Sequence, residues 1–496
     1  MRLWLFGIAG LALAATSSGP APFLDNQAQA QVPQSISARD KADGAKAHPQ
    51  LLAEFGGLYE GNQAAYVTRI GQSVAAQSGL ANSPQEFTIS LLNSPVNNAF
   101  AIPGGYVYIT RQLMALMNNE AELASVLGHE VGHVAARHSA KRNSRATRAG
   151  LGAVLATVLG GVLLGESGAR LGQELGSAIA QRYVLSYSRA QEYEADDLGV
   201  IYLTRAGYDP IAASTMLASL AAQTSLDTRR AGKSDKPLPE WARTHPDPGS
   251  RVVRARQKAA TMAPNARTVN RDAFVAMLDG MLYDDDPNQG LVEGSLFRHP
   301  DLRLSFAAPA GFVLNNAPDA VTITGTGGKA QFSGGKFEGD LDAYVRRVLR
   351  DVGGSQSTLS SSTVRRTNVN GLPVAYAVAR ATTNSGWVDV TVYAYEFGPK
   401  TAYHILSMTP VGSSVFSPLF DSVRKLSDTE AAAIRPRQID IMTVGAKDTI
   451  QSLSARMAYA DYQQERFRVL NGLAENEPLR VGQKVKVVTL ARAKTG

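Results

Sequence analysis

The stretch "GHEVGH" (residues 128–133) places two histidines four positions apart, with a glutamate directly after the first. Apolar residues around it recur at helical spacing, and positions i and i+4 of a helix share one face. His129 and His133 can therefore direct both imidazoles at one ion, and neutral imidazole nitrogens are good zinc ligands. Glu130 would lie beside the metal, where it could take a proton from water and pass it to a leaving amine. The motif predicts one Zn2+ per chain and hydrolytic chemistry.

A catalytic zinc site of this type needs a third protein ligand from another helix and an open fourth position. The stretch "SRAQEYEADDLG" offers carboxylates, because Glu192 and Asp196 lie four positions apart on one helical face. Glu192 would complete the ligand set. Asp196 would accept a hydrogen bond from the outer ring nitrogen of a ligand histidine and fix its tautomer. From spacing alone, Glu194 or Asp197 could serve in place of Glu192.

Helices and strands must hold these motifs in place. Helical spacing recurs from about Gln50 to Asn82, and "EFTISLL" then alternates as a strand does. The stretch "NNAFAIPGGYVYIT" (residues 97–110) predicts a strand, a turn and a second strand. Residues 179–223 predict two helices that break at "GYDP", and "RTHPDPGSRVVRARQKA" predicts a turn followed by a helix.

Four of these stretches, taken in order, resemble a known family. "NNAFAIPGGYVYIT", "ELASVLGHEVGHVAARH", "SRAQEYEADDLG" and "THPDPGSR" are similar to the zinc metallopeptidases that include the CAAX prenyl protease, the HtpX proteases and the BepA-type periplasmic proteases, over about residues 45–260. The family pattern E-x-x-A-D falls on residues 192–196, so the resemblance implies Glu192 as the third ligand. It implies that His245 either closes the open metal position in a latent state or stabilises the oxyanion. Arg251 fits the family's basic residue, which would orient substrate or a carboxylate, although a surface role is an alternative.

The resemblance also implies a place for the substrate. The residues that resemble the family's edge strand beside the cleft are Asn98, Ala99, Phe100 and Ala101. An exposed strand edge can pair with an extended backbone of almost any sequence. His138 is interpreted as a packing residue or as one that contacts a metal ligand. The isolated histidines, for which we expect structural roles, are His48, His299 and His404.

The composition changes after about Met262, and the remaining chain predicts two further domains. Strand-like runs with two helices predict an α+β domain of unknown role at residues 300–428. Residues 437–490 resemble a LysM module of the order βααβ, which would bind glycans such as peptidoglycan. The Gly-Asp pair that usually precedes its first helix reads "AKDT" here, so a module that packs on its neighbour is the alternative. The predicted fold class is α+β, with a mainly helical zincin-like domain and a small edge sheet at residues 31–262.

The first 30 residues predict a secretory signal peptide, because Arg2 precedes an apolar run to Ala15 and then small residues. An uncleaved membrane anchor is the alternative, but the run is shorter than the roughly 18 residues of a span. The chain contains no cysteine, which excludes thiolate metal sites and cysteine catalysis. Its net charge of +7 favours anionic envelope polymers or lipid head groups as partners over nucleic acid. The apolar run 149–165 predicts a buried or oligomer-facing helix, with peripheral membrane contact as the alternative.

These features together predict an exported, periplasmic zinc endopeptidase that hydrolyses peptide bonds of unfolded or misassembled envelope proteins, with chaperone activity as a possible addition. One alternative is a non-proteolytic chaperone or scaffold whose zinc site is closed by His245. Another is a peptidoglycan-cleaving metallohydrolase. The expected partners are envelope proteins and, through the tail, peptidoglycan, and no nucleic acid is expected.

Overall fold

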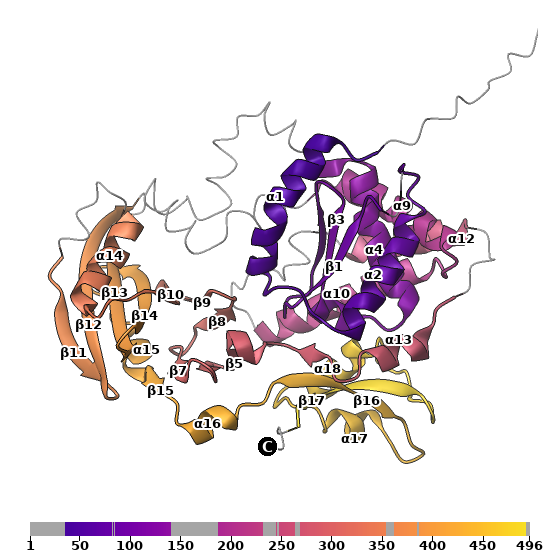
Figure 1. The fold of residues 1–496 in the computed structure, drawn as a ribbon. Coiled ribbons are helices and arrows are strands. Elements are labelled where there is room, and N and C mark those ends of the chain that lie inside the picture. The colour runs from indigo at the N-terminus through magenta and orange to yellow at the C-terminus, as the bar shows by residue number, and fades with distance from the viewer. Residues whose placement is uncertain are drawn as a thin grey trace, which may run out of the picture.

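The computed structural model describes residues 35–492 apart from 82, 84, 140–186, 232–244, 246–247, 263–267, 354–361 and 384–385. The predicted signal peptide and the apolar run 149–165 lie outside these residues. Within them, no helix is both long enough and apolar enough to cross a bilayer. The chain is α+β, as predicted, and Figure 1 shows its helical part in indigo and magenta, with an orange domain to one side and a yellow tail below.

A small sheet lies next to the first two helices. Its elements are α1 (Ala38–Glu54), α2 (Asn62–Ala75), β1 (Thr88–Leu92), β2 (Ala99–Ile102) and β3 (Tyr106–Thr110). The strand order is β1-β3-β2, with β1 parallel and β2 antiparallel to β3, so β2 forms an edge of the sheet. Helical spacing predicted helix from Gln50 to Asn82, but α1 starts earlier and the chain turns between the helices at Gly56 and Gly57, which both have positive φ.

Helices form the region that holds the motifs. They are α3 (Arg111–Leu116), α4 (Glu120–Ala135), α9 (Arg189–Arg205), α10 (Ala212–Ala231) and α12 (Pro248–Ala260). Helix α4 starts at Asn119, whose side chain accepts from the backbone of Glu122. A Cβ atom at Gly132 would lie 3.1 Å from the carbonyl oxygen of Ala195, and one at Gly199 would lie 3.0 Å from the backbone nitrogen of His129. Glycine at these crossing points therefore lets α4 and α9 approach closely enough to share one site.

The orange domain consists of two antiparallel sheets and two helices (Figure 1). The larger sheet has the order β11-β12-β13-β14-β10-β9-β8, with strands β8 (Val313–Asn316), β9 (Ala320–Gly325), β10 (Gly328–Lys336), β11 (Arg365–Val369), β12 (Leu372–Thr383), β13 (Gly386–Gly398) and β14 (Thr401–Pro410). The smaller sheet has the order β15-β7-β6-β5, with β5 (Leu291–Glu293), β6 (Leu296–His299), β7 (Leu304–Ala307) and β15 (Arg424–Lys425). Helix α14 (Leu341–Gly353) covers one face of the larger sheet, and α15 (Ser417–Ser422) with the smaller sheet covers the other.

The tail packs against the helical domain. Its elements are β16 (Arg437–Thr443), α17 (Ile450–Ser454), α18 (Gln463–Leu470) and β17 (Lys484–Leu490). The pair β16–β17 is extended by β4 (Leu282–Tyr283), which follows α13 (Arg271–Met277). Phe467 and Val485 of the tail belong to the same apolar cluster as Leu113 and Leu123 of the helical domain. The tail thus has the order βααβ and shares its core with the domain that carries the motifs.

Candidate metal centre

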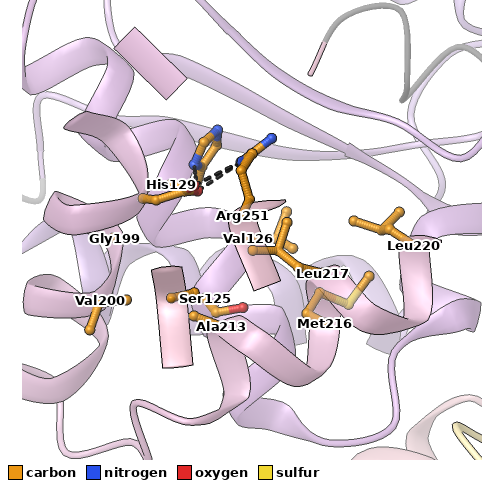
Figure 2. Close-up of a pocket in the computed structure, with 12 residues that line it drawn as sticks. Ser125, Val126, His129, Gly199, Val200, Ala213, Met216, Leu217, Leu220 and Arg251 are labelled. Atoms are coloured by element: carbon orange, nitrogen blue, oxygen red, sulfur yellow. Dashed lines mark hydrogen bonds and ion pairs between the residues drawn. The ribbon is translucent and has the colours of Figure 1, made fainter. Parts of the chain in front are cut away.

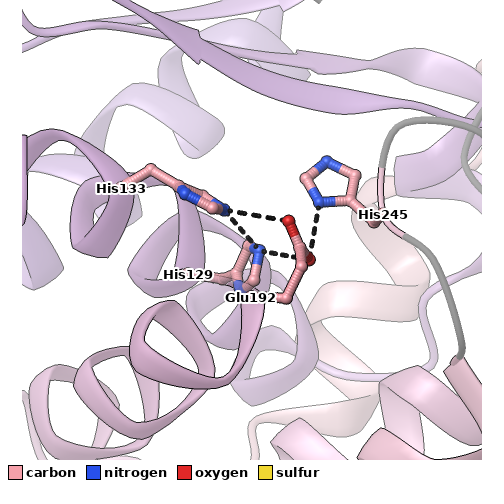
Figure 3. Close-up of side chains that lie close together, drawn as sticks. All are labelled: His129, His133, Glu192 and His245. Carbon is pink, nitrogen blue, oxygen red and sulfur yellow. Dashed lines mark hydrogen bonds and ion pairs between the residues drawn. The ribbon is translucent and has the colours of Figure 1, made fainter. Parts of the chain in front are cut away.

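Four buried side chains meet between α4, α9 and the segment before α12. The potential ligand atoms of His129, His133, Glu192 and His245 all lie within 4.8 Å of one another. Figure 3 shows the two imidazoles of α4 and the carboxylate of Glu192 directed at one point, with His245 opposite. Spacing along the chain predicted His129 and His133 as ligands, and the resemblance selected Glu192 and added His245. The structure brings all four together.

The spacing of the donor atoms fits a zinc ion. The Nε2 atoms of His129 and His133 are 3.0 Å apart, and each lies 3.6 Å from an oxygen of Glu192. Tetrahedral ligands at zinc bond lengths stand about 3.4 Å from one another, which lies between these separations. Burial and the neighbouring histidine charges hold the pKa of His133 well below its ordinary value, so its ring is neutral, as a metal ligand must be.

Glu130 lies beside this group without belonging to it. Its side chain is fully buried, and neither carboxylate oxygen has a hydrogen-bond partner among the described residues. The Oε1 atom lies 3.7 Å from Nε2 of His245. Burial raises the pKa of Glu130, although the nearby charges of His245 and His129 oppose this. A buried carboxylate without a hydrogen-bond partner is costly, and Glu130 has the position that a proton acceptor beside the metal group would need.

Asp196 and Arg251 orient His129 from the side of its ring that faces away from the metal group. Oδ1 of Asp196 lies 2.9 Å from Nδ1 of His129. Arg251 donates two hydrogen bonds to Asp196, of 2.8 and 2.7 Å, and its Nη1 lies 2.9 Å from Oε2 of Glu192. Burial alone would raise the pKa of Asp196, but the hydrogen bonds and charge of Arg251 hold it well below its ordinary value. Arg251 is 1% exposed, so it orients two carboxylates in the interior and does not lie at the surface.

A small cavity lies behind this pair, between α4, α9, α10 and α12. Figure 2 shows His129 and Arg251 at one end and the apolar side chains of Met216 and Leu217 at the other. Its volume of about 30 Å³ is that of one water molecule. The cavity is therefore too small to hold a peptide substrate.

His245 connects the metal group to the edge strand. Its Nδ1 lies 3.1 Å from Oε2 of Glu192, and its Nε2 lies 3.1 Å from the carbonyl oxygen of Ala99 in β2. Burial would lower the pKa of His245, but the charge and hydrogen bond of Glu192 raise it above its ordinary value. The predicted substrate strand thus lies beside the site, with Ala99 at its centre.

The other residues predicted for this strand anchor it. The backbone N–H of Thr110 donates to the carbonyl oxygen of Asn98, the N–H of Asn98 donates to the hydroxyl of Thr110, and Ala101 faces Val107 of β3. The ring of Phe100 packs on Phe55 and Tyr108 at centroid distances of 5.0 and 4.8 Å. One side of β2 is therefore fixed to β3, while its other side faces the site.

His138 has a more specific place than the sequence suggested. Its Nδ1 lies 2.8 Å from Nδ1 of His133, and its Nε2 lies 3.1 Å from Oε2 of Glu194. A continuous helix would point His138 away from the metal, but α4 ends at Ala135 and Arg137 has φ of 55°. This left-handed turn brings His138 back to the ligand. Tyr187, which the sequence gave no reason to select, stacks on His133 at 3.9 Å.

The comparison with known proteins agrees with this geometry. Residues 61–259, which contain all four residues of the metal group, match peptidase family M48. Residues 61–259 are an M48 domain. The single zinc ion predicted from the motif is the cofactor of this domain, and the buried group of His129, His133, Glu192 and His245 could hold a metal ion.

Relatives of the M48 domain occur in bacteria and in mitochondria. The chain is 33% identical to the beta-barrel assembly-enhancing protease of Yersinia pestis over 242 residues, which is 48% of each chain. It is 33% identical to the protein of that name from Escherichia coli (strain K12) over 45% of each chain. The mitochondrial metalloendopeptidase OMA1 of Schizosaccharomyces pombe is 29% identical over 38% of this chain and 50% of its own. The chain thus spans about half the length of these relatives or less.

Proposed function

We propose that this chain is an exported, zinc-dependent endopeptidase that hydrolyses peptide bonds of unfolded or misassembled envelope proteins. The observation that carries the proposal is the placement of Glu130, a buried carboxylate without a hydrogen-bond partner among the described residues, directly beside the metal group. In a structural zinc site, protein side chains fill every coordination position, and no free carboxylate is needed beside the metal. A hydrolytic site needs a base at this position.

His129, His133 and Glu192 would hold the zinc ion. When bound, zinc acts as a Lewis acid that polarises a carbonyl group and makes water more acidic. Glu130 takes the proton of the attacking water and passes it to the nitrogen of the leaving amine. Asp196 and Arg251 keep His129 and Glu192 in place during this transfer, because the guanidinium group contacts both carboxylates.

The proposed substrate is an extended chain that pairs with the free edge of β2. Such pairing uses backbone groups, so it suits unfolded proteins of varied sequence. The acceptor at Ala99 is already bonded to His245, which also contacts Glu192. We therefore propose that the structure represents the latent state, and that His245 leaves before a substrate strand binds.

The proposed setting is the bacterial periplasm. Relatives of the M48 domain are named beta-barrel assembly-enhancing proteases, and the sequence begins with the pattern of a signal peptide. Misassembled envelope proteins are the proposed partners, and peptidoglycan is a proposed ligand of the tail. Chaperone activity without cleavage is the second candidate, because the position of His245 among the metal-binding residues would suit a permanently closed site.

A Glu130→Gln variant tests the proposal. It keeps the shape of the side chain but cannot accept a proton, so we expect casein cleavage to fall at least about 10²-fold. Zinc content, measured by elemental analysis, should stay at one ion per chain. The matched control is Glu60→Gln, an exposed carboxylate directly before residue 61, which should cleave as the unmodified protein does. Undiminished cleavage by Glu130→Gln would refute a catalytic role, and muropeptide release from purified sacculi would refute the choice of substrate.

A further inference from the structure

The two histidines of α4 in the metal group differ in the partners of their outer ring nitrogens, which face away from that group. The outer nitrogen of His129 contacts the carboxylate of Asp196 directly, at 2.9 Å. The outer nitrogen of His133 contacts a second imidazole, that of His138, at 2.8 Å. His138 in turn contacts Glu194 at 3.1 Å. His129 thus contacts a carboxylate directly, whereas His133 reaches one only through His138.

The protons of the longer connection can be assigned from its far end. The carboxylate of Glu194 only accepts, so Nε2 of His138 carries a proton and donates it. A neutral His138 then has a bare Nδ1, which accepts from Nδ1 of His133. This leaves Nε2 of His133 without a proton and free to bind a metal, and Nε2 is the atom that lies 3.0 Å from Nε2 of His129.

Packing holds these rings in one orientation. His138 is fully buried, and its ring stands at 70° to that of His133 with the centroids 5.0 Å apart. Tyr187 stacks on His133 with an interplanar angle of 17°. Gln191 of α9 donates to the carbonyl oxygen of His138 at 3.4 Å. The position of His138 is therefore set by contacts with α9 as well as by the turn at Arg137.

Helix α9 supplies both ends of the arrangement. Glu192 belongs to the metal group, and Glu194 ends the histidine connection two residues later. The side chain of Glu194 is 51% exposed, whereas that of Asp196 is 8% exposed. Water can thus reach the carboxylate of Glu194, whereas Arg251 covers that of Asp196.

We propose that His138 and Glu194 are positioning residues that select the tautomer of His133 and thereby set the zinc affinity of the site. The inference rests on the proposed function, in which His133 is a zinc ligand. His138 contacts neither metal nor substrate, and it acts through His133. Its loss should weaken zinc binding by about 10- to 100-fold, as for other partners of metal-bound histidines.

The test is zinc affinity, measured by competition with a fluorescent chelator on the full chain. His138→Phe fills the space but offers no acceptor, and we expect it to bind zinc about 10- to 100-fold more weakly. His138→Asn places an amide oxygen where Nδ1 lies, and we expect it to retain most of the affinity. Glu194→Ala should lose less than His138→Phe, because water can replace its exposed carboxylate.

The outcomes separate the inference from the proposed function. Folded His138→Phe with unchanged zinc affinity would overturn the role of His138 and leave the metal centre intact. An unmodified protein that binds no zinc would overturn both. If His138→Phe does not fold, long-range ¹H–¹⁵N correlation spectra of the zinc-loaded unmodified protein decide the question. A proton on Nδ1 of His133 and on Nε2 of His138 is expected, and any other assignment overturns the inference.

Discussion

Two regions follow the M48 domain, and their cores are organised in opposite ways. The domain of residues 291–426 buries its aromatic side chains among themselves, with Phe306 and Phe332 in one cluster and Tyr344 of α14 in another. The tail of residues 437–490 places Phe467 in the cluster that also holds Leu113 and Leu123 of the M48 domain. The first region is a separate folding unit by this criterion, whereas the second completes the core of the domain with the metal group. Resemblance to a small binding module does not show whether that module stands alone.

A buried lysine makes the connection of the tail specific. Lys486 of β17 is fully buried and donates to the carbonyl oxygens of Ala115 and Met117, at 2.8 and 2.6 Å. Ala115 lies in the last turn of α3, and Met117 directly follows that helix. Asn471 fixes the backbone of Lys486 on both sides, because it accepts from its N–H and donates to its carbonyl oxygen. The tail is therefore hydrogen-bonded to the chain shortly before α4, the helix that carries His129.

The largest expected effect is a loss of stability in two matched variants, one in the core of each region. Phe467 is 0% and Phe306 is 1% exposed, so Phe→Ala at either position should cost about 3–5 kcal/mol of its core's stability. We expect Phe467→Ala to lower the temperature at which the M48 domain releases zinc, and Phe306→Ala to leave it unchanged. Calorimetry combined with a zinc-responsive dye would measure both transitions. Equal zinc-release temperatures in the two variants would contradict the shared core.

A somewhat smaller loss of unfolding free energy is expected from Lys486→Met. The variant keeps an apolar stem of similar length but leaves two carbonyls and the buried carboxylate of Glu122 without the ammonium group. Loss of one partner from such a buried arrangement should cost about 3 kcal/mol. Lys484→Met, two residues earlier in the same strand and only partly buried, is the control and should stay within about 0.5 kcal/mol. Urea unfolding would measure both, and similar midpoints for the two variants would show that the tail is not held by this lysine.

The last expected effect is a gradual dependence on pH. Burial lowers the pKa of Lys486 from 10.5 to about 7 in the folded protein, and the charges of Glu122 and Arg271 act on it in opposite directions. Between these two values the unfolded chain binds one more proton, so the contribution of Lys486 to the free energy of unfolding rises by about 1.4 kcal/mol per pH unit. That contribution is lost as the pH falls through 7. The gap in unfolding temperature between the unmodified protein and Lys486→Met should therefore widen from pH 7 to pH 10, and a narrowing gap would refute this assignment.

The sequence predicted the parts of the metal centre that depend on one helix at a time. His129 and His133 share a face of α4, and Glu192 and Asp196 share a face of α9, because the helical repeat dictates which residues are neighbours. Strand alternation and the Pro-Gly-Gly turn likewise predicted β2 and β3. These features depend on backbone geometry that local sequence is sufficient to specify.

Tertiary structure alone decided the contacts that depend on where a helix stops and what packs against it. His138 reaches His133 because α4 ends at Ala135 and the chain turns at Arg137, which helical spacing cannot reveal. Arg251 is an interior partner of two carboxylates only because α12 packs on α9. Lys486 would be a surface lysine of an isolated module, and it is buried because the tail lies on α3. For Arg251 and Lys486, a charged group was placed by a neighbour distant in sequence, whose approach depends on the whole core.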